Sequence, residues 1–151
     1  MKLRGVIQKV SEAKVEVDGV TIGQINKGLM VLIGIKESDD EKVMDYMLDK
    51  IINLRIFEDN EGKMNLSLKD VGGELLIVPN FTLYGDARKG KRPSYSKGAS
   101  PNVAEKIYNT FIEKAKQMGV KVEQGKFRAH MEVSLVNDGP VTILLDSDKN
   151  F

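Results

Sequence analysis

Apolar and polar residues alternate along the first 35 positions of the chain. A period of two residues is typical of strands that bury one face. Glycine residues interrupt the alternation at positions 19, 23, 28 and 34, where turns or bulges are expected. The pattern therefore predicts three or four antiparallel strands between residues 3 and 35.

The apolar period changes to that of a helix in two segments. From residue 39 to 53 apolar residues recur at helical spacing, and Ser38 with Glu41 three residues later forms a capping-box pattern. A second amphipathic segment runs from about residue 101 to 118 and follows Ser100, a good N-cap residue. Two main helices are therefore predicted.

Strand patterns fill most of the remaining chain. Further strands are predicted at residues 54–57, 74–83, 120–123, 131–136 and 141–146. Neither an internal repeat nor a linker is found along the sequence. The chain is therefore expected to form one α/β domain over residues 1–151, with mixed or antiparallel β-sheets that carry the two helices.

Composition and charge exclude several classes of protein. The chain has 151 residues, no cysteine and a single histidine, His130, so cysteine-ligated zinc, thiolate nucleophiles and histidine-rich metal sites are excluded. Lys and Arg number 23 against 22 Asp and Glu, so any site for a polyanion must be local. No apolar run reaches the length of a membrane span or resembles a signal peptide. We expect a cytoplasmic protein without a metal.

Two familiar catalytic patterns are missing or incomplete. No Gly-x-Ser-x-Gly sequence occurs, and a serine triad would have to use His130. Residues 85–91 match the spacing of a phosphate-binding loop, but Arg92 replaces the Ser or Thr that holds magnesium, and Pro93 disfavours the helix that should follow. A nucleoside triphosphate site is not predicted.

The segment from residue 85 to 97 is nevertheless the most basic part of the chain. Its five basic residues face one acidic residue, Asp86, and Tyr84 and Tyr95 lie near its ends. The basic residues are Arg88, Lys89, Lys91, Arg92 and Lys97. Taken alone, this composition is typical of a solvated loop, but it also suits a loop that holds a nucleic-acid backbone and stacks on bases.

Two short motifs do not fit regular strands. PNFTL, at residues 79–83, places proline and asparagine at the end of an apolar run, where a sheet ladder is expected to break. NDGPVT, at residues 137–142, is typical of a hairpin turn, although Pro140 directly after Gly139 favours a more specialised backbone.

These motifs, together with GKMNLSLKDV, KGKRPSYSKGASP and GKFRAHM, resemble those of the D-aminoacyl-tRNA deacylase family. The resemblance runs from residue 1 to about residue 146. The family pattern Asn-x-Gly-Pro-x-Thr is intact as Asn137, Gly139, Pro140 and Thr142. In the other hallmark, Ser-Gln-Phe-Thr-Leu, Pro79 and Asn80 stand in place of Ser and Gln, and Lys9 replaces the usual Arg.

The resemblance implies a barrel-like sheet with two helices and a homodimer that hydrolyses the ester between a D-amino acid, or glycine, and the 3′ end of tRNA, without a cofactor. It implies a cis Gly-Pro bond that enters the partner subunit's pocket and excludes L-amino acids. The implied catalytic residues are Asn80, Phe81 and Thr82, and the implied substrate-binding residues are Met131, Asn137, Gly139, Pro140 and Thr142. The basic residues Arg88, Lys89, Lys91 and Arg92 would contact tRNA phosphates.

Two mechanisms and three functions remain open at this point. Thr82 could be the nucleophile, or backbone N–H groups near Phe81 and Thr82 could stabilise the oxyanion while the ribose 2′-hydroxyl of the tRNA assists. We favour the second mechanism because no base adjoins Thr82 in its motif. The alternatives to the deacylase are a non-catalytic RNA-binding module and a hydrolase of small D-amino-acid derivatives.

Overall fold

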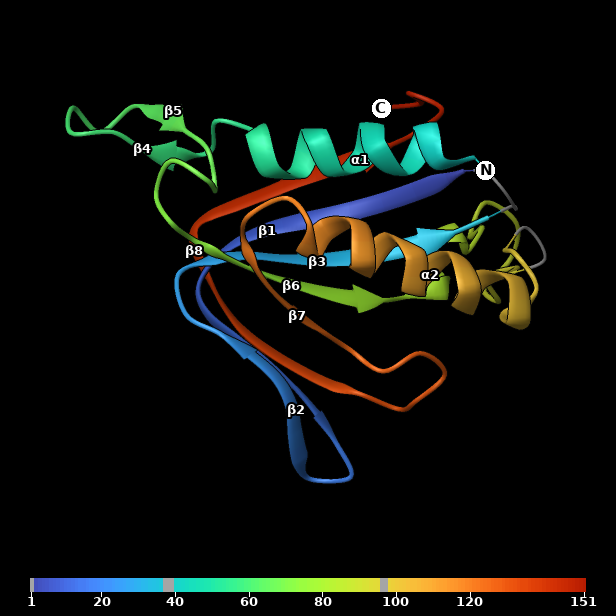
Figure 1. Ribbon diagram of the computed structural model, residues 1–151. Helices are drawn as coiled ribbons and strands as arrows, with labels where there is room; N and C mark the ends of the chain where they lie inside the picture. The colour runs from blue at the N-terminus through green and yellow to red at the C-terminus, as the bar shows by residue number, and fades with distance from the viewer. Residues whose placement is uncertain (1, 37–39, 96–97) are drawn as a thin grey trace.

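The computed structural model describes residues 2–36, 40–95 and 98–151, and its elements are arranged as a curved sheet with helices on one face (Figure 1). The strands are β1 (Leu3–Val17), β2 (Val20–Ile25), β3 (Gly28–Ile35), β4 (Phe57–Glu58), β5 (Met64–Leu66), β6 (Glu74–Pro79), β7 (Lys121–Gln124) and β8 (Glu132–Asp146). The helices are α1 (Glu41–Asn53), α2 (Pro101–Lys116) and the short 3₁₀ helix η1 (Phe81–Tyr84).

The long strand β1 organises the main sheet. On one side its first part pairs with β3 and its last part with β2, while β8 pairs along its other side, all antiparallel. The strands β6 and β7 continue the sheet from β3 in parallel. A Cβ atom added at Gly23 in β2 would lie 2.9 Å from the carbonyl oxygen of Gln124 in β7. The sheet therefore curls until β2 meets β7, which makes it nearly a closed barrel.

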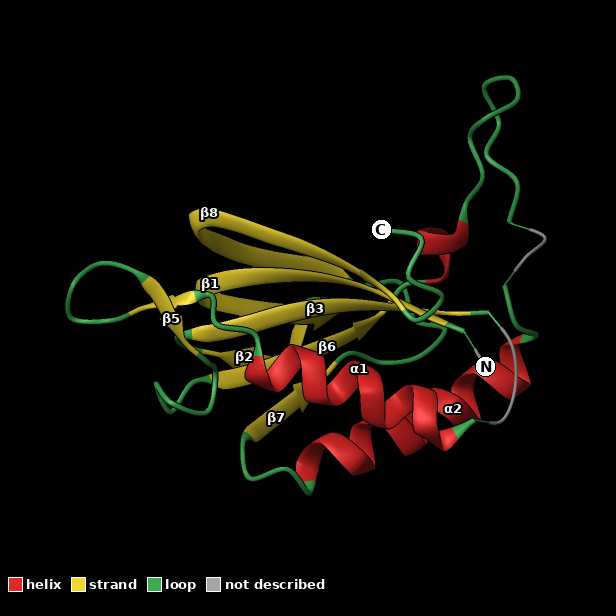
Figure 2. Ribbon diagram, turned by 90° about the horizontal axis from the view of Figure 1, so that it is seen from above, coloured by secondary structure: helices red, strands yellow, loops and turns green. Residues whose placement is uncertain are grey.

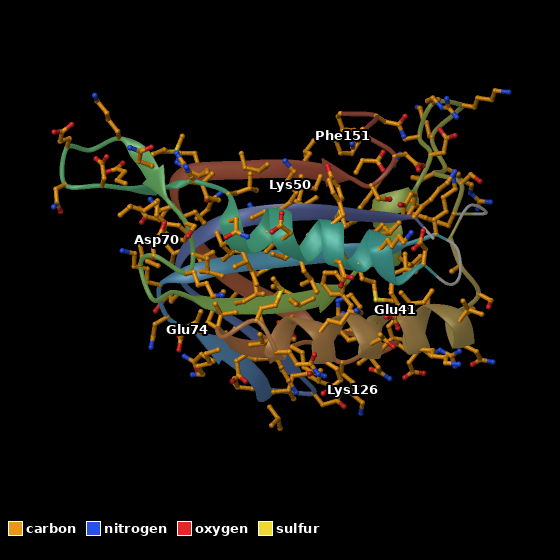
Figure 3. The ribbon with its side chains drawn as sticks, turned by 45° about the horizontal axis from the view of Figure 1, so that its top comes forward. Glu41, Lys50, Asp70, Glu74, Lys126 and Phe151 are labelled. Carbon is orange, nitrogen blue, oxygen red and sulfur yellow. The ribbon has the colours of Figure 1, made fainter. Side chains whose placement is uncertain are left out.

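Both faces of the sheet are buried around β3 and β6. The helices α1 and α2 lie on the same face (Figures 1 and 2), and Glu41 and Lys50 mark the course of α1 over the sheet in Figure 3. The concave face holds a second core. Its members are Val10, Ala13, Val15, Ile25, Met30, Leu76 and Val78. Burial on both faces explains why β6 has an unbroken apolar run rather than alternation.

The predicted α/β fold with two main helices is confirmed, and the helix ends differ in detail. Asp40 caps α1 by accepting a hydrogen bond from the Lys42 backbone N–H at 3.0 Å. The predicted capping residue Ser38 lies outside the described residues. Ser100 occupies the N-cap position of α2, but its side chain makes no capping hydrogen bond.

Four strand predictions were wrong in extent. The strand predicted at 74–83 ends at Pro79, since the chain then turns into η1 under the cap of Asn80. The segment predicted at 54–57 has only its last residue in a strand, because Leu54 still caps α1, and the polar segment after it contributes β5. The two strands predicted at 131–136 and 141–146 are a single strand, β8, so the hairpin interpretation of NDGPVT is wrong.

None of the described helices is long and apolar enough to cross a membrane.

A buried tyrosine of α2 ties the helix to the sheet edge that leads to the site. The Tyr108 hydroxyl lies 3.0 Å from the carbonyl oxygen of Ile77 and 2.9 Å from that of Gly125. Burial raises the pKa of Tyr108, so the phenol stays protonated, and its one hydrogen is shared between these two carbonyls. The hydroxyl therefore holds β6 next to the segment that follows β7.

Removal of this hydroxyl should lower stability. Tyr108→Phe leaves the buried Gly125 carbonyl without its donor, whereas the Ile77 carbonyl still accepts from the Gly125 N–H at 2.8 Å, so we expect the free energy of unfolding to fall by about 1–3 kcal/mol. Urea denaturation measures the change, with Tyr46→Phe as the control, because no hydrogen bond from the Tyr46 hydroxyl is found within the described residues. Equal stabilities of the two variants would contradict this assignment.

Candidate functional site

The PNFTL segment forms a compact turn at the end of β6. The Asn80 side-chain oxygen accepts hydrogen bonds from the Thr82 backbone N–H at 3.2 Å and from the Thr82 hydroxyl at 2.5 Å. Asn80 therefore begins η1 and fixes the threonine rotamer. Phe81 is 68% exposed, and its backbone N–H has no hydrogen-bond partner within the described part of the chain.

A large cavity of about 1020 Å³ opens beside this turn. Described residues from separate parts of the chain form it: the end of β3, the end of β6 with η1, Tyr95 with residues 98–104, and residues 127–133. Its lining is mainly apolar, with Phe127 and Met131 among the side chains. At 1020 Å³ the cavity is large enough for a cofactor-sized or nucleoside-sized ligand.

Two aromatic rings stand together in the wall of the cavity. Phe81 and Tyr95 pack edge to face with ring centroids 5.4 Å apart, and both are exposed. Exposed aromatic faces beside an apolar cavity provide stacking surfaces for a nucleobase.

The NDGPVT segment is an irregularity within the edge strand β8. Asn137 pairs with Val10 of β1 and Thr142 pairs with Gln8, so four residues of β8 lie opposite Lys9 alone. The Asn137 side chain spans the protrusion, because its Nδ2 donates to the Thr142 hydroxyl at 3.0 Å and its Oδ1 accepts from the Val141 N–H at 3.1 Å.

The backbone at the tip of this protrusion requires glycine. Gly139 has φ +137°, and a Cβ atom there would lie 2.9 Å from the backbone nitrogen of Val141. The Gly139–Pro140 peptide bond is cis, and both residues are exposed. The buried Lys9 lies opposite them on β1, and its Nζ is 3.9 Å from the Asp138 carboxylate.

The basic segment forms a narrow ribbon that projects beside η1 (Figure 2). Asp86 and Ser94 exchange two backbone hydrogen bonds of 2.8 Å, and Gly90 lies near the tip with φ +68°. The Asp86 carboxylate binds the Arg88 guanidinium through two hydrogen bonds, of 2.9 and 2.6 Å, and raises the pKa of Arg88.

Arg88 is thus engaged within the ribbon, whereas its neighbours are available. Lys89, Lys91 and Arg92 are exposed, and no carboxylate of the described residues lies within 4.0 Å of their charged groups. Lys97, the fifth basic residue of the segment, lies outside the described residues.

Comparison with known proteins assigns the family. The model of the D-Tyr-tRNA(Tyr) deacylase family matches residues 6–146. The chain belongs to this family. It is 61% identical over 149 residues to a D-aminoacyl-tRNA deacylase of Clostridioides difficile (strain 630), with 99% of this chain and all of that protein covered. A D-aminoacyl-tRNA deacylase of Thermosipho africanus (strain TCF52B) is 60% identical over the same length and with the same coverage. Among solved structures, the c-Myc DNA unwinding element binding protein is similar, with a TM-score of 0.88 and 40% identity over 94% of this chain and 97% of that one.

Within this family member, the residues predicted for the site fall into three places. Asn80, Phe81, Thr82 and Met131 all line the cavity. The segment from Asn137 to Thr142 does not line the cavity of its own chain. The basic residues lie on the ribbon that leads from η1 toward Tyr95.

Two polar residues of the cavity wall were not predicted as site residues from the sequence. Arg128 and His130 both line it, because residues 127–131 fold back against the ends of β3 and β6. The GKFRAHM segment carried the family resemblance, but nothing in its pattern placed it next to η1.

The position of His130 bears on the choice between mechanisms. His130 is exposed in the same cavity as Thr82, yet no hydrogen bond between them is found in the described part of the chain. The Thr82 hydroxyl instead donates its proton to an amide oxygen, which is not a base. An activated nucleophile needs a base within hydrogen-bond reach, so this geometry does not favour Thr82 in that role.

Proposed function

We propose that this chain hydrolyses the ester bond between a D-amino acid and the 3′-terminal adenosine of tRNA, and so acts in translation quality control in the cytoplasm. The observation that supports this most directly is the cavity in which Asn80, Phe81, Thr82 and Met131 meet. An apolar cavity with exposed aromatic rings suits an adenosine, and the capped η1 presents polar groups where an ester would lie. Family membership and the deacylase names of its relatives point to the same reaction.

Chiral selection is proposed to act across a homodimer. Gly139 and Pro140 protrude from the edge strand β8 and do not line their own cavity. The same strand exposes the apolar side chains of Val136 and Leu144, which suits a contact with a second copy. Main-chain atoms from the partner would then read the α-amino group and the Cα hydrogen, exclude an L side chain by steric clash and tolerate many D side chains, as well as glycine.

In the mechanism that we favour, the enzyme positions an ester that is already labile. The Phe81 N–H, which has no hydrogen-bond partner among the described residues, would donate to the carbonyl oxygen as it becomes an oxyanion. The Thr82 N–H is already bound to Asn80, so it is not available for this role unless the turn opens. Water adds to the carbonyl carbon, the bond to the ribose oxygen breaks, and the neighbouring ribose hydroxyl supports the proton transfer to that oxygen.

The first experiment compares D-tyrosyl-tRNA with L-tyrosyl-tRNA as substrates of the purified protein in the presence of a metal chelator. Rapid loss of the D-ester alone would support a chiral deacylase that needs no metal. If tRNA binds and neither ester is cleaved, the RNA-binding module is the better explanation. If small D-amino-acid esters are cleaved as fast as the charged tRNA, the small-molecule hydrolase is favoured.

The basic ribbon is proposed to contact phosphates of the acceptor stem. If so, the double variant Lys89→Gln/Lys91→Gln should reduce the slope of log affinity against log salt by about 0.9 for each lost duplex contact. Arg88→Gln should change it less, because Asp86 already occupies that guanidinium.

Filter binding of uncharged tRNA at several salt concentrations measures these slopes. The matched control is Lys42→Gln/Lys50→Gln, which removes the same charge from the exposed face of α1. A slope that stays the same in the ribbon variant would refute the contact.

A further inference from the structure

Arg128 is an isolated cation in the wall of the cavity. Among the described lining residues it is the one with a permanent charge, and none of them is a carboxylate. No described acidic group lies within 4.0 Å of its guanidinium. A cation with no carboxylate beside it among the described residues, in a mainly apolar wall, is well placed to meet an anionic part of the ligand.

The guanidinium is held in place rather than free. Its Nη2 donates a hydrogen bond of 2.8 Å to the side-chain oxygen of Asn102, the second residue of α2. This bond uses one of the five N–H donors of arginine and leaves the others for a ligand. The Arg128 backbone has a positive φ, +65°, which is uncommon for a residue other than glycine and is shared in this chain by Asp18 and Lys149.

We infer that Arg128 binds the 5′-phosphate of the terminal adenosine, which is the phosphodiester that joins it to the preceding nucleotide. This assignment rests on the proposed function. With the ester at η1 and the base against Phe81 and Tyr95, the nearest negative charge of the substrate is that phosphate. Arg128 would then distinguish the end of an RNA chain from a simple nucleoside ester, separately from the acceptor-stem contacts of the ribbon.

The test uses three substrates that differ in phosphate content: D-tyrosyl-tRNA, the D-tyrosyl ester of adenosine 5′-monophosphate, and that of adenosine. For Arg128→Gln we expect KM to rise about tenfold with the first two, which corresponds to about 1.4 kcal/mol, with kcat little changed. With the adenosine ester, KM should change by less than about twofold, because this substrate has no phosphate for Arg128 to bind.

Three further variants keep the test decisive. Arg128→Gly removes the side chain, and glycine adopts φ +65° without strain, so this variant should fold and behave like Arg128→Gln. Asn102→Ala should raise KM for the tRNA less, by about threefold, since it only releases the guanidinium. Lys126→Gln is the control, because it removes one charge from the same loop outside the cavity lining.

The outcomes separate this inference from the proposed function. Equal effects of Arg128→Gln on the adenosine ester and on the monophosphate ester would overturn the phosphate assignment, as would an equal effect of Lys126→Gln. A wild-type protein that cleaves none of the three esters would instead refute the deacylase function itself.

Discussion

Replacement of Gly139 by alanine is expected to lower the deacylation of D-tyrosyl-tRNA by about two orders of magnitude. The new Cβ would lie 2.7 Å from Cγ2 of Val141 and 2.9 Å from its backbone nitrogen, and alanine does not readily adopt φ +137°. The tip of the protrusion must therefore shift. A displacement of about 1 Å at a positioning group can cost a hundredfold in rate.

The control is Gly19→Ala, because Gly19 also has positive φ, +78°, but nothing lies within 4 Å of an added Cβ. This variant should keep its activity and lose only a little stability. If Gly139→Ala is folded and as active as Gly19→Ala, the protrusion does not take part in catalysis.

A mixed dimer tests whether Gly139 serves the partner subunit's cavity. One parent is Gly139→Ala, which keeps its cavity. The other is Asn80→Ala/Phe81→Ala, which keeps its protrusion but loses the η1 cap and the exposed ring. Each parent should be nearly inactive, and after the subunits exchange at equal amounts activity should recover to about a quarter of wild type. No recovery, in a mixture shown to contain mixed dimers, would contradict the cross-subunit arrangement.

Local patterns predicted most of the elements correctly, since the period of the apolar residues follows the face that each element buries. The errors occur where side chains replace backbone pairing. The Asn137 amide spans the protrusion of β8 and keeps in one strand a segment that is typical of a turn. At Asn80 the side chain begins a helix where an apolar run had predicted continued strand.

The candidate site was predicted in part for a similar reason. The motifs at η1 and in β8 could be recognised from the sequence because their residue types are unusual for strands. Arg128 and His130 became site residues only through the fold, which brings residues 127–131 against η1. No pattern within a short segment reveals such a contact, because it depends on how β7 and the following loop pack on β6.

The last prediction separates the two mechanisms. Thr82→Ala should retain turnover within about tenfold of wild type, because the Asn80 oxygen still accepts the backbone N–H of residue 82 and η1 stays capped. A D-tyrosyl-tRNA that ends in 2′-deoxyadenosine, charged at the 3′-hydroxyl, should instead be cleaved about 10²- to 10⁴-fold more slowly by the wild-type protein.

Single-turnover rates with both substrates measure these effects, and the affinity for the uncharged deoxy-terminated tRNA controls for binding. If the ribose hydroxyl assists the reaction, the deoxy substrate binds normally and reacts slowly, with either Thr82 or alanine at position 82. A folded Thr82→Ala protein without activity, together with normal cleavage of the deoxy substrate, would show that the threonine is the nucleophile. The base would then have to be a group that reaches Thr82 only when the substrate is bound, and His130 is the candidate within the described cavity wall.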